Sequence, residues 1–209
     1  MAPTAYFVTR VSSSTPNPQK PKTIVANLDY ADAAPKFAYA GLGVESMYTA
    51  PTPRNPDIHI GKAVPAWARG QHEHSNRAPQ HKDRNLYAAV SLDMAPYQRA
   101  LKLIVKCENA DATYTDLRIV AADEDKEAVV HALEADAVRV AEEADEESSV
   151  RSREKGVVVV SDAETGRTII WEVHGFEVNN VSGGEVEGRR VLTEEEEKGR
   201  LWLGEKQWA

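Results

Sequence analysis

Apolar and polar residues follow a strand pattern most clearly between residues 156 and 178. Residues 157–160 are four consecutive valines, and residues 168–173 combine β-branched and aromatic side chains. The segment SDAETG at residues 161–166 separates the two runs. Because β-branched and aromatic residues favour strands and a short segment ending in glycine favours a tight turn, this stretch predicts a β-hairpin.

The second strand of this hairpin has a break in its alternation. In an extended chain Ile169, Trp171 and Val173 share one face, whereas the next large apolar residue, Phe176, falls on the other face. A bulge of one residue at His174 and the glycine after it would return the apolar residues to a single side. The sequence therefore predicts a bulge at this position.

Two ionisable residues of the same strand, Glu172 and His174, are candidate catalytic residues. They are two positions apart and therefore share one face. A carboxylate beside an imidazole is the combination that an acid-base pair requires. The alternative is that both belong to the polar outer face of a structural strand.

Alternation predicts further strands elsewhere in the chain. They cover residues 5–11, 23–30, 57–64, 87–92, 100–108 and 114–121, with a less regular candidate at 37–44. We expect the strands at 100–108 and 114–121 to pair as a second hairpin across the turn ENADAT. Cys107 lies on the apolar side of the first of these strands, which indicates a small buried residue rather than a nucleophile.

A helical period replaces the strand pattern at residues 123–147. The acidic residues at 123–125 suit a helix N-terminus, where free backbone N–H groups favour negative charge. Val129, Leu133 and Ala137 recur at four-residue steps and form an apolar stripe. We expect this helix to pack on a sheet through that stripe.

Charge and proline content divide the chain near residue 86. Residues 1–85 contain ten Lys and Arg against six Asp and Glu, a balance of +4, whereas residues 86–209 contain fifteen against twenty-seven, a balance of −12. Ten of the eleven prolines precede residue 80. The composition therefore predicts Pro-rich, mildly basic strands with an extended arm at 1–85, an α+β core domain at 86–192 and a C-terminal docking tail at 193–209.

Length and composition exclude several classes of protein. A chain of 209 residues can bury a substantial core, and it contains no apolar run long enough to cross a bilayer. The first residues lack the continuous apolar segment of a secretory signal, and a single cysteine cannot form an internal disulfide. These features predict a cytoplasmic or other intracellular protein without membrane contact, or a component of a particle assembled there.

Residues 46–84 lack helical periodicity and contain five prolines, and apart from the short strand at 57–64 they are expected to form a long irregular loop. Within it, His72 and His74 place both imidazoles on one side of an extended chain, and His81 follows nearby. Imidazole is a common ligand of divalent metals, so these residues are a candidate metal site for a metal-dependent or acid-base small-molecule enzyme. Their spacing matches no defined zinc motif, and the alternative is a solvated loop that binds no cofactor.

The same loop carries several arginines, among them Arg69 and Arg77, and aromatic residues that could stack on bases. The sequence pI of about 5.3 argues against nucleic acid as the main partner. We therefore assign Arg69 and Arg77 to contacts with a protein partner, while nucleic acid stays open as an alternative.

The C-terminal residues predict a segment that binds to another surface. Thr193 and Glu196 fit a capping box, which favours one helical turn that stops at Gly199. Large apolar residues follow at the end of the chain: Leu201, Trp202, Leu203 and Trp208. Such residues either pack back on their own domain or anchor on a partner.

These patterns together predict an α+β fold. It would consist of a mainly antiparallel sheet of five to eight strands, one principal helix on that sheet, a long Pro-rich irregular N-terminal half and a C-terminal tail. For function they favour a non-enzymatic structural protein. This protein would dock through its arm and aromatic tail into a homo-multimer or a larger complex, such as a virus particle or capsid. The alternative is the enzyme that uses the His-rich loop at residues 72–81.

Overall fold

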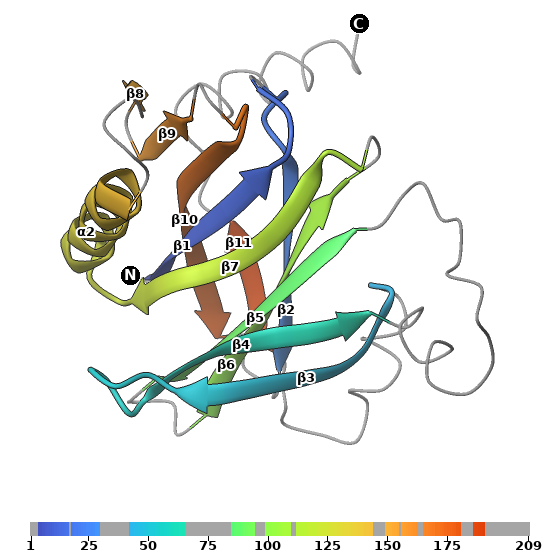
Figure 1. Cartoon of the computed structure of the whole chain (residues 1–209). Helices are drawn as coiled ribbons and strands as arrows, with labels where there is room; N and C mark the ends of the chain where they lie inside the picture. The colour runs from blue at the N-terminus through green and yellow to red at the C-terminus, as the bar shows by residue number, and fades with distance from the viewer. Residues whose placement is uncertain are drawn as a thin grey trace, which may run out of the picture.

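The computed structural model of the chain describes residues 4–16, 18–29, 42–65, 85–94, 99–109, 112–143, 149–154, 156–162, 165–180 and 186–190. Within these residues it contains eleven strands and one helix (Figure 1). In chain order they are β1 (Thr4–Ser13), β2 (Lys22–Asp29), β3 (Val44–Pro51), β4 (Ile58–Pro65), β5 (Leu86–Met94), β6 (Arg99–Glu108), β7 (Tyr114–Asp123), α2 (Lys126–Glu143), β8 (Ser149–Glu154), β9 (Val157–Ser161), β10 (Thr168–Asn180) and β11 (Val186–Arg190).

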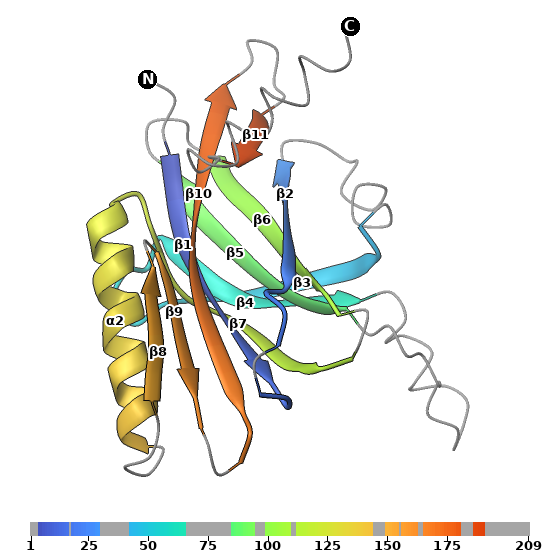
Figure 2. The same ribbon diagram turned by 90° about the horizontal axis from the view of Figure 1, so that it is seen from above.

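The strands form two antiparallel sheets. The first sheet has the order β7-β1-β10-β9-β8, with β11 also paired to β10, and the second has the order β2-β6-β5-β4-β3. Helix α2 lies along one face of the first sheet, and the second sheet packs on its other face (Figure 1, Figure 2). The molecule therefore has three layers, with the first sheet in the middle.

The main core lies between the two sheets. Phe7 and Phe176 of the first sheet are buried there with Leu103 and Val105 of the second sheet. Because neighbouring strand residues point to opposite faces, Val8 points away from this core and toward α2. Alternate residues of β1 thus pack into two different cores, one between the sheets and one beneath α2.

A second core joins α2 to the first sheet. The buried stripe of the helix consists of Val129, Leu133 and Ala137. It packs on Val8 and Trp171 of the sheet, which confirms the predicted helix and its apolar face. Asp125 caps the helix, since its Oδ1 accepts the backbone N–H of Glu127 at 2.9 Å. No helix in the described part of the chain is long and apolar enough to span a membrane.

Strand pairing confirms one predicted hairpin and contradicts the other. β9 and β10 pair antiparallel, with Thr168 opposite Ser161. The expected second hairpin is wrong, because β6 pairs with β2 and β5, whereas β7 pairs with β1 in the other sheet. The turn between β6 and β7 therefore carries the chain from one sheet to the other. The prediction of a single sheet of five to eight strands is wrong for the same reason.

The bulge predicted at His174 is also wrong. The register between β10 and β1 runs without a shift from Thr168 to Glu177. The alternation changes because both faces of β10 are covered: Trp171 faces α2, and Phe176 faces the second sheet. A strand buried on both faces carries apolar residues on both sides, so a change of side requires no extra residue.

The irregular strand is β7. Val8 of β1 lies opposite Ala121, but the next residue, Thr9, lies opposite Ile119. Val120 is therefore an extra residue in β7. Before this bulge the odd-numbered residues Leu117 and Ile119 face the core between the sheets, whereas after it the even-numbered Ala122 does. Val120 and the three residues that follow it in β7 all border the space beside α2.

Strands from both compositional halves of the chain pair within each sheet. β1 lies between β7 and β10, and β2 pairs with β6. β4 confirms the strand predicted at residues 57–64, whereas its antiparallel partner β3 was not predicted, so the expectation of an irregular loop is wrong for residues 46–51. Residues 66–84 lie outside the described residues. The broad α+β class fits the antiparallel sheets and their helix, but the irregular N-terminal half is not confirmed.

Candidate functional site

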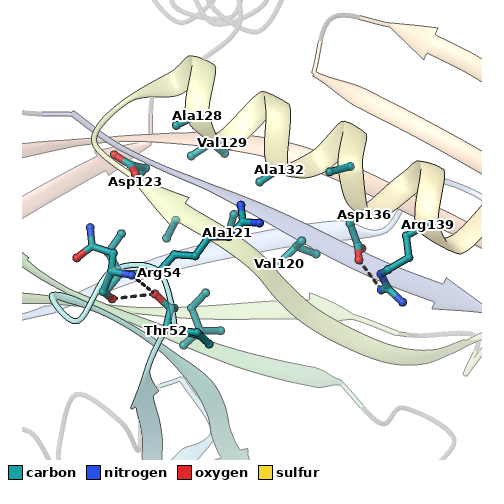
Figure 3. Close-up of a pocket in the computed structure, with 16 residues that line it drawn as sticks. Thr52, Arg54, Val120, Ala121, Asp123, Ala128, Val129, Ala132, Asp136 and Arg139 are labelled. Carbon is teal, nitrogen blue, oxygen red and sulfur yellow. Dashed lines mark hydrogen bonds and ion pairs between the residues drawn. The ribbon is translucent and has the colours of Figure 1, made fainter.

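A cleft with a volume of about 560 Å³ lies between α2, β7 and the turn that joins β3 to β4 (Figure 3). Its apolar lining residues are Ala128, Val129, Ala132 and Ala135 of α2, Val120, Ala121 and Ala122 of β7, and Ile58 and Ile60 of β4. Clefts of this size and apolar character accommodate small ligands or inserted side chains. We therefore take this cleft as the candidate functional site.

Small side chains on α2 leave the room for this cleft. Ala128, Ala132 and Ala135 recur at helical spacing, so they form a row next to the buried stripe. Four consecutive residues of β7, 120–123, line the opposite side of the same space, and the bulge at Val120 lies at the start of this run. The alanine row is a sequence signal from which the cleft could have been inferred, whereas the bulge left none.

The turn between β3 and β4 forms another wall of the cleft and is held by its own hydrogen bonds. Thr52 Oγ1 accepts the backbone N–H of Asn55 at 3.2 Å and donates to the Asn55 carbonyl at 2.8 Å. The backbone N–H of Thr52 donates to the carbonyl of Ile58 at 2.8 Å. This turn carries the exposed Arg54, which has no ion-pair partner among the described residues.

Asp136 lies at the far end of the cleft and connects three elements. Its carboxylate accepts hydrogen bonds from Trp171 Nε1 at 2.9 Å, from Arg10 Nη1 at 3.0 Å and from Arg139 Nη2 at 2.6 Å. The side chains of Arg10 and Asp136 are only 14% and 12% exposed. These contacts join α2 to β1 and β10, and Figure 3 shows the pair that Asp136 forms with Arg139.

The environment of Asp136 favours its charged form. Burial of the carboxyl group favours the neutral form, but the hydrogen bonds from Trp171 and Arg139 and the charge of Arg10 outweigh burial, so the pKa of Asp136 lies below its ordinary value. A carboxylate with a lowered pKa stays ionised near neutral pH and is a poor general acid there. We therefore interpret this group as a structural anion at the rim of the cleft.

The candidate catalytic residues Glu172 and His174 lie in the core between the sheets, where they are 9% and 2% exposed. Their alternative placement on a polar outer face is wrong. His174 Nε2 lies 2.9 Å from Thr9 Oγ1 and 3.9 Å from Glu172 Oε2. The ring of His174 stacks on Phe7, with 5.0 Å between ring centroids, and Lys20 Nζ lies 2.8 Å from Glu172 Oε1.

The structure thus brings Glu172 and His174 together within a packed polar cluster. In an acid-base relay the carboxylate orients the histidine through the ring nitrogen that does not face the proton donor. Here the carboxylate of Glu172 and the hydroxyl of Thr9 both lie at Nε2 of the same ring. A substrate would also have to displace core residues to reach His174. We therefore assign this cluster to holding β1, β10 and the segment that follows β1 together.

Cys107 is fully buried in the core between the sheets, as its apolar position predicted. Burial, and secondly the charge of Glu108, raises the pKa of the Cys107 thiol to about 12. At a pH of about 8 only about 1 thiol in 10,000 would then be ionised. We expect a thiol reagent to label the native protein at least about 100-fold more slowly than the protein unfolded in guanidinium, measured by absorbance.

A matched control for this labelling is Val138→Cys, because Val138 is 50% exposed on α2. This variant should react rapidly at one thiol and slowly at the other. Rapid labelling of the native parent protein, whose one thiol is Cys107, would contradict the buried position of that residue.

The other predicted site residues lie outside the described residues. They are the candidate metal ligands His72, His74 and His81, the basic loop residues Arg69 and Arg77, and the tail residues Leu201, Trp202, Leu203 and Trp208. Their roles stay predictions. Within the residues that the structure describes, no group of three or more His, Cys, Asp and Glu side chains is placed to hold a metal ion.

Comparison with known proteins identifies no relative: no protein family, no curated protein and no solved structure matches this chain. The function therefore has to be inferred from the geometry of the cleft and from the composition of the chain.

Proposed function

We propose that this chain is a non-enzymatic structural protein that assembles into a homo-multimer or a larger complex, such as a capsid-like particle. The cleft beside α2 receives an apolar segment during this assembly. The observation that carries the proposal is the composition of the cleft, which combines an apolar lining with the charged residues Arg54, Asp123, Asp136 and Arg139. Protein interfaces use this arrangement, because anchoring side chains fill an apolar pocket while polar groups surround it.

The distribution of charge supports contacts between copies. Helix α2 carries five acidic residues against two basic residues, whereas the first 85 residues of the chain have a balance of +4. Opposite charges on two parts of one chain steer the acidic part of one copy toward the basic part of another. Such steering weakens as salt is added, because ions screen exposed charges.

Assembly can be tested by measuring the solution mass with light scattering after size exclusion. We expect an oligomer at low salt whose mass falls at high salt. The variant Ala135→Glu places a charge in the cleft. Docking would bury this charge without a partner, at a cost of several kcal/mol, so the variant should weaken assembly at least about tenfold. Val138→Glu is the matched control, because Val138 is also exposed on α2 but does not line the cleft.

Two outcomes would contradict the proposal. A monomer at every protein concentration and salt concentration would argue against self-assembly. An oligomer that the two glutamate variants weaken equally would argue against the cleft as the docking surface. Both residues are exposed, so both variants should retain the melting temperature of the parent protein within a few degrees.

A further inference from the structure

The last described residue of the chain, Arg190, lies near the end of the first sheet at which β7 leads into α2. Arg190 of β11 lies opposite Phe176 of β10, and Phe176 lies opposite Ala5 of β1. The neighbour of Ala5, Tyr6, lies opposite Asp123, which lines the cleft. Arg190 is thus separated from the cleft end of β7 by three strand spacings, about 14 Å.

The remaining chain is long enough to reach the cleft of the same molecule. Ten residues, 191–200, separate Arg190 from Leu201. With residues 193–198 in the predicted helical turn, at about 1.5 Å per residue, and the other four residues extended, this segment spans about 22 Å, which still exceeds the separation across the sheet. The apolar residues that follow can therefore reach α2 without leaving their own molecule.

The chemistry of the tail matches that of the cleft. Leu201, Trp202 and Leu203 are three consecutive apolar residues, and the acidic residues at 194–197 precede them. The cleft offers aliphatic side chains to the first group. Its charged lining is balanced between two arginines and two aspartates, so the partner of the acidic group would be Arg54 on the turn between β3 and β4 rather than the acidic helix α2. Large anchors buried in an apolar pocket supply most of the binding energy of such contacts, whereas charge pairs at the rim contribute little energy and mainly orient the segment.

We propose that Leu201, Trp202 and Leu203 of the chain's own C-terminal tail occupy the cleft beside α2 in the free protein, and that assembly requires their release. This inference rests on the proposed function. It adds to that function a closed state, in which the tail of a monomer occupies its own cleft. A tethered segment has an effective concentration of about the millimolar range, so at micromolar protein the segment of the same molecule outcompetes that of another copy. Exchange between copies then converts a closed monomer into an assembly.

Disulfide trapping in the full chain tests where the tail binds. Ala135→Cys in the cleft is combined with Gly204→Cys, which leaves the three apolar anchors unchanged. The control combines Val138→Cys with Gly204→Cys, so that the new helix cysteine is exposed but outside the cleft. The native Cys107 is buried and does not take part. A disulfide requires Cα atoms within about 7 Å, so its rate of formation reports proximity.

We expect an intramolecular disulfide to form at least about tenfold faster with Ala135→Cys than with Val138→Cys, measured by mass spectrometry and non-reducing gels. Adding Trp202→Ala should remove most of this difference, because it deletes the largest anchor. Equal rates at the two positions, or no disulfide at either, would overturn the proposal. Disulfides that form mainly between molecules would also overturn it, but they would support docking between copies.

The trapped protein also separates this inference from the proposed function. The oxidised Ala135→Cys/Gly204→Cys variant should stay monomeric at concentrations where the same variant assembles after reduction. If it assembles equally in both states, release of the tail is not required and the regulatory step is wrong. If the reduced and parent proteins never assemble while the tail is trapped in the cleft, the proposed function fails but docking of the tail stands.

Discussion

The variant Trp171→Ala should lower the free energy of unfolding by about 3–5 kcal/mol, the cost of truncating a large buried aromatic side chain. Trp171 is fully buried on the central strand β10, where it packs on Val129 and Leu133 of α2. It also donates its indole N–H to Asp136 at 2.9 Å. Truncation would therefore open a cavity beneath the helix and remove a donor from the buried carboxylate.

Urea denaturation measures this effect, and Trp171→Phe serves as its control. Phenylalanine keeps much of the apolar volume but cannot donate to Asp136, so we expect this variant to lose about 1–3 kcal/mol. A loss below about 1 kcal/mol for Trp171→Ala would contradict the packing of α2 on β10. Equal losses for the two variants would show that the hydrogen bond, rather than the cavity, accounts for the effect.

Elements whose signals are local could be predicted from the sequence. The hairpin of β9 and β10 depends on two β-branched runs and the turn between them, and α2 depends on the spacing of Val129, Leu133 and Ala137. Each of these signals lies within about 25 consecutive residues. The structure confirms both elements and the burial of Cys107.

Pairing between distant strands could not be predicted in this way. The pattern of β6 and β7 fits a hairpin as well as it fits two strands in different sheets, because both arrangements bury the same faces. The change of side between Val173 and Phe176 was misread for a related reason. An amphipathic strand needs a bulge at such a change, whereas a strand with α2 on one face and a sheet on the other does not.

In the candidate site, too, features with a local sequence signal could be predicted, whereas features that depend on distant strands could not. Glu172 and His174 were predicted to share a face and do so, yet their burial depends on the second sheet, which no local pattern reports. The cleft depends on Val120, whose extra position in β7 exists only relative to β1. Only the alanine row of α2 was readable from the sequence, and by itself such a row also fits an ordinary exposed helix face.

Asp136→Ala should also destabilise the protein by about 3–5 kcal/mol, because it breaks a largely buried ion pair and leaves its partners without an acceptor. Arg10 would keep its charge at 14% exposure, and the indole N–H of Trp171 would stay buried. Urea denaturation measures the loss. Arg139→Ala is the control, because Arg139 reaches the same carboxylate from an exposed position and its removal should change stability far less. Equal losses for the two variants would contradict this assignment.

The pH dependence of stability identifies the charge of Asp136 as the cause. The pKa of Asp136 is lower in the folded protein than in the unfolded chain, where it is about 3.9. Its charged form therefore stabilises the fold fully above a pH of about 4, and this contribution is lost as the pH falls through the folded pKa.

The isosteric Asp136→Asn cannot ionise, so the difference in unfolding free energy between the parent and this variant should be largest near neutral pH and shrink in acid. The other carboxylates are common to both proteins and cancel in that difference. A difference that stays constant down to a pH of about 3 would mean that Asp136 acts through packing alone.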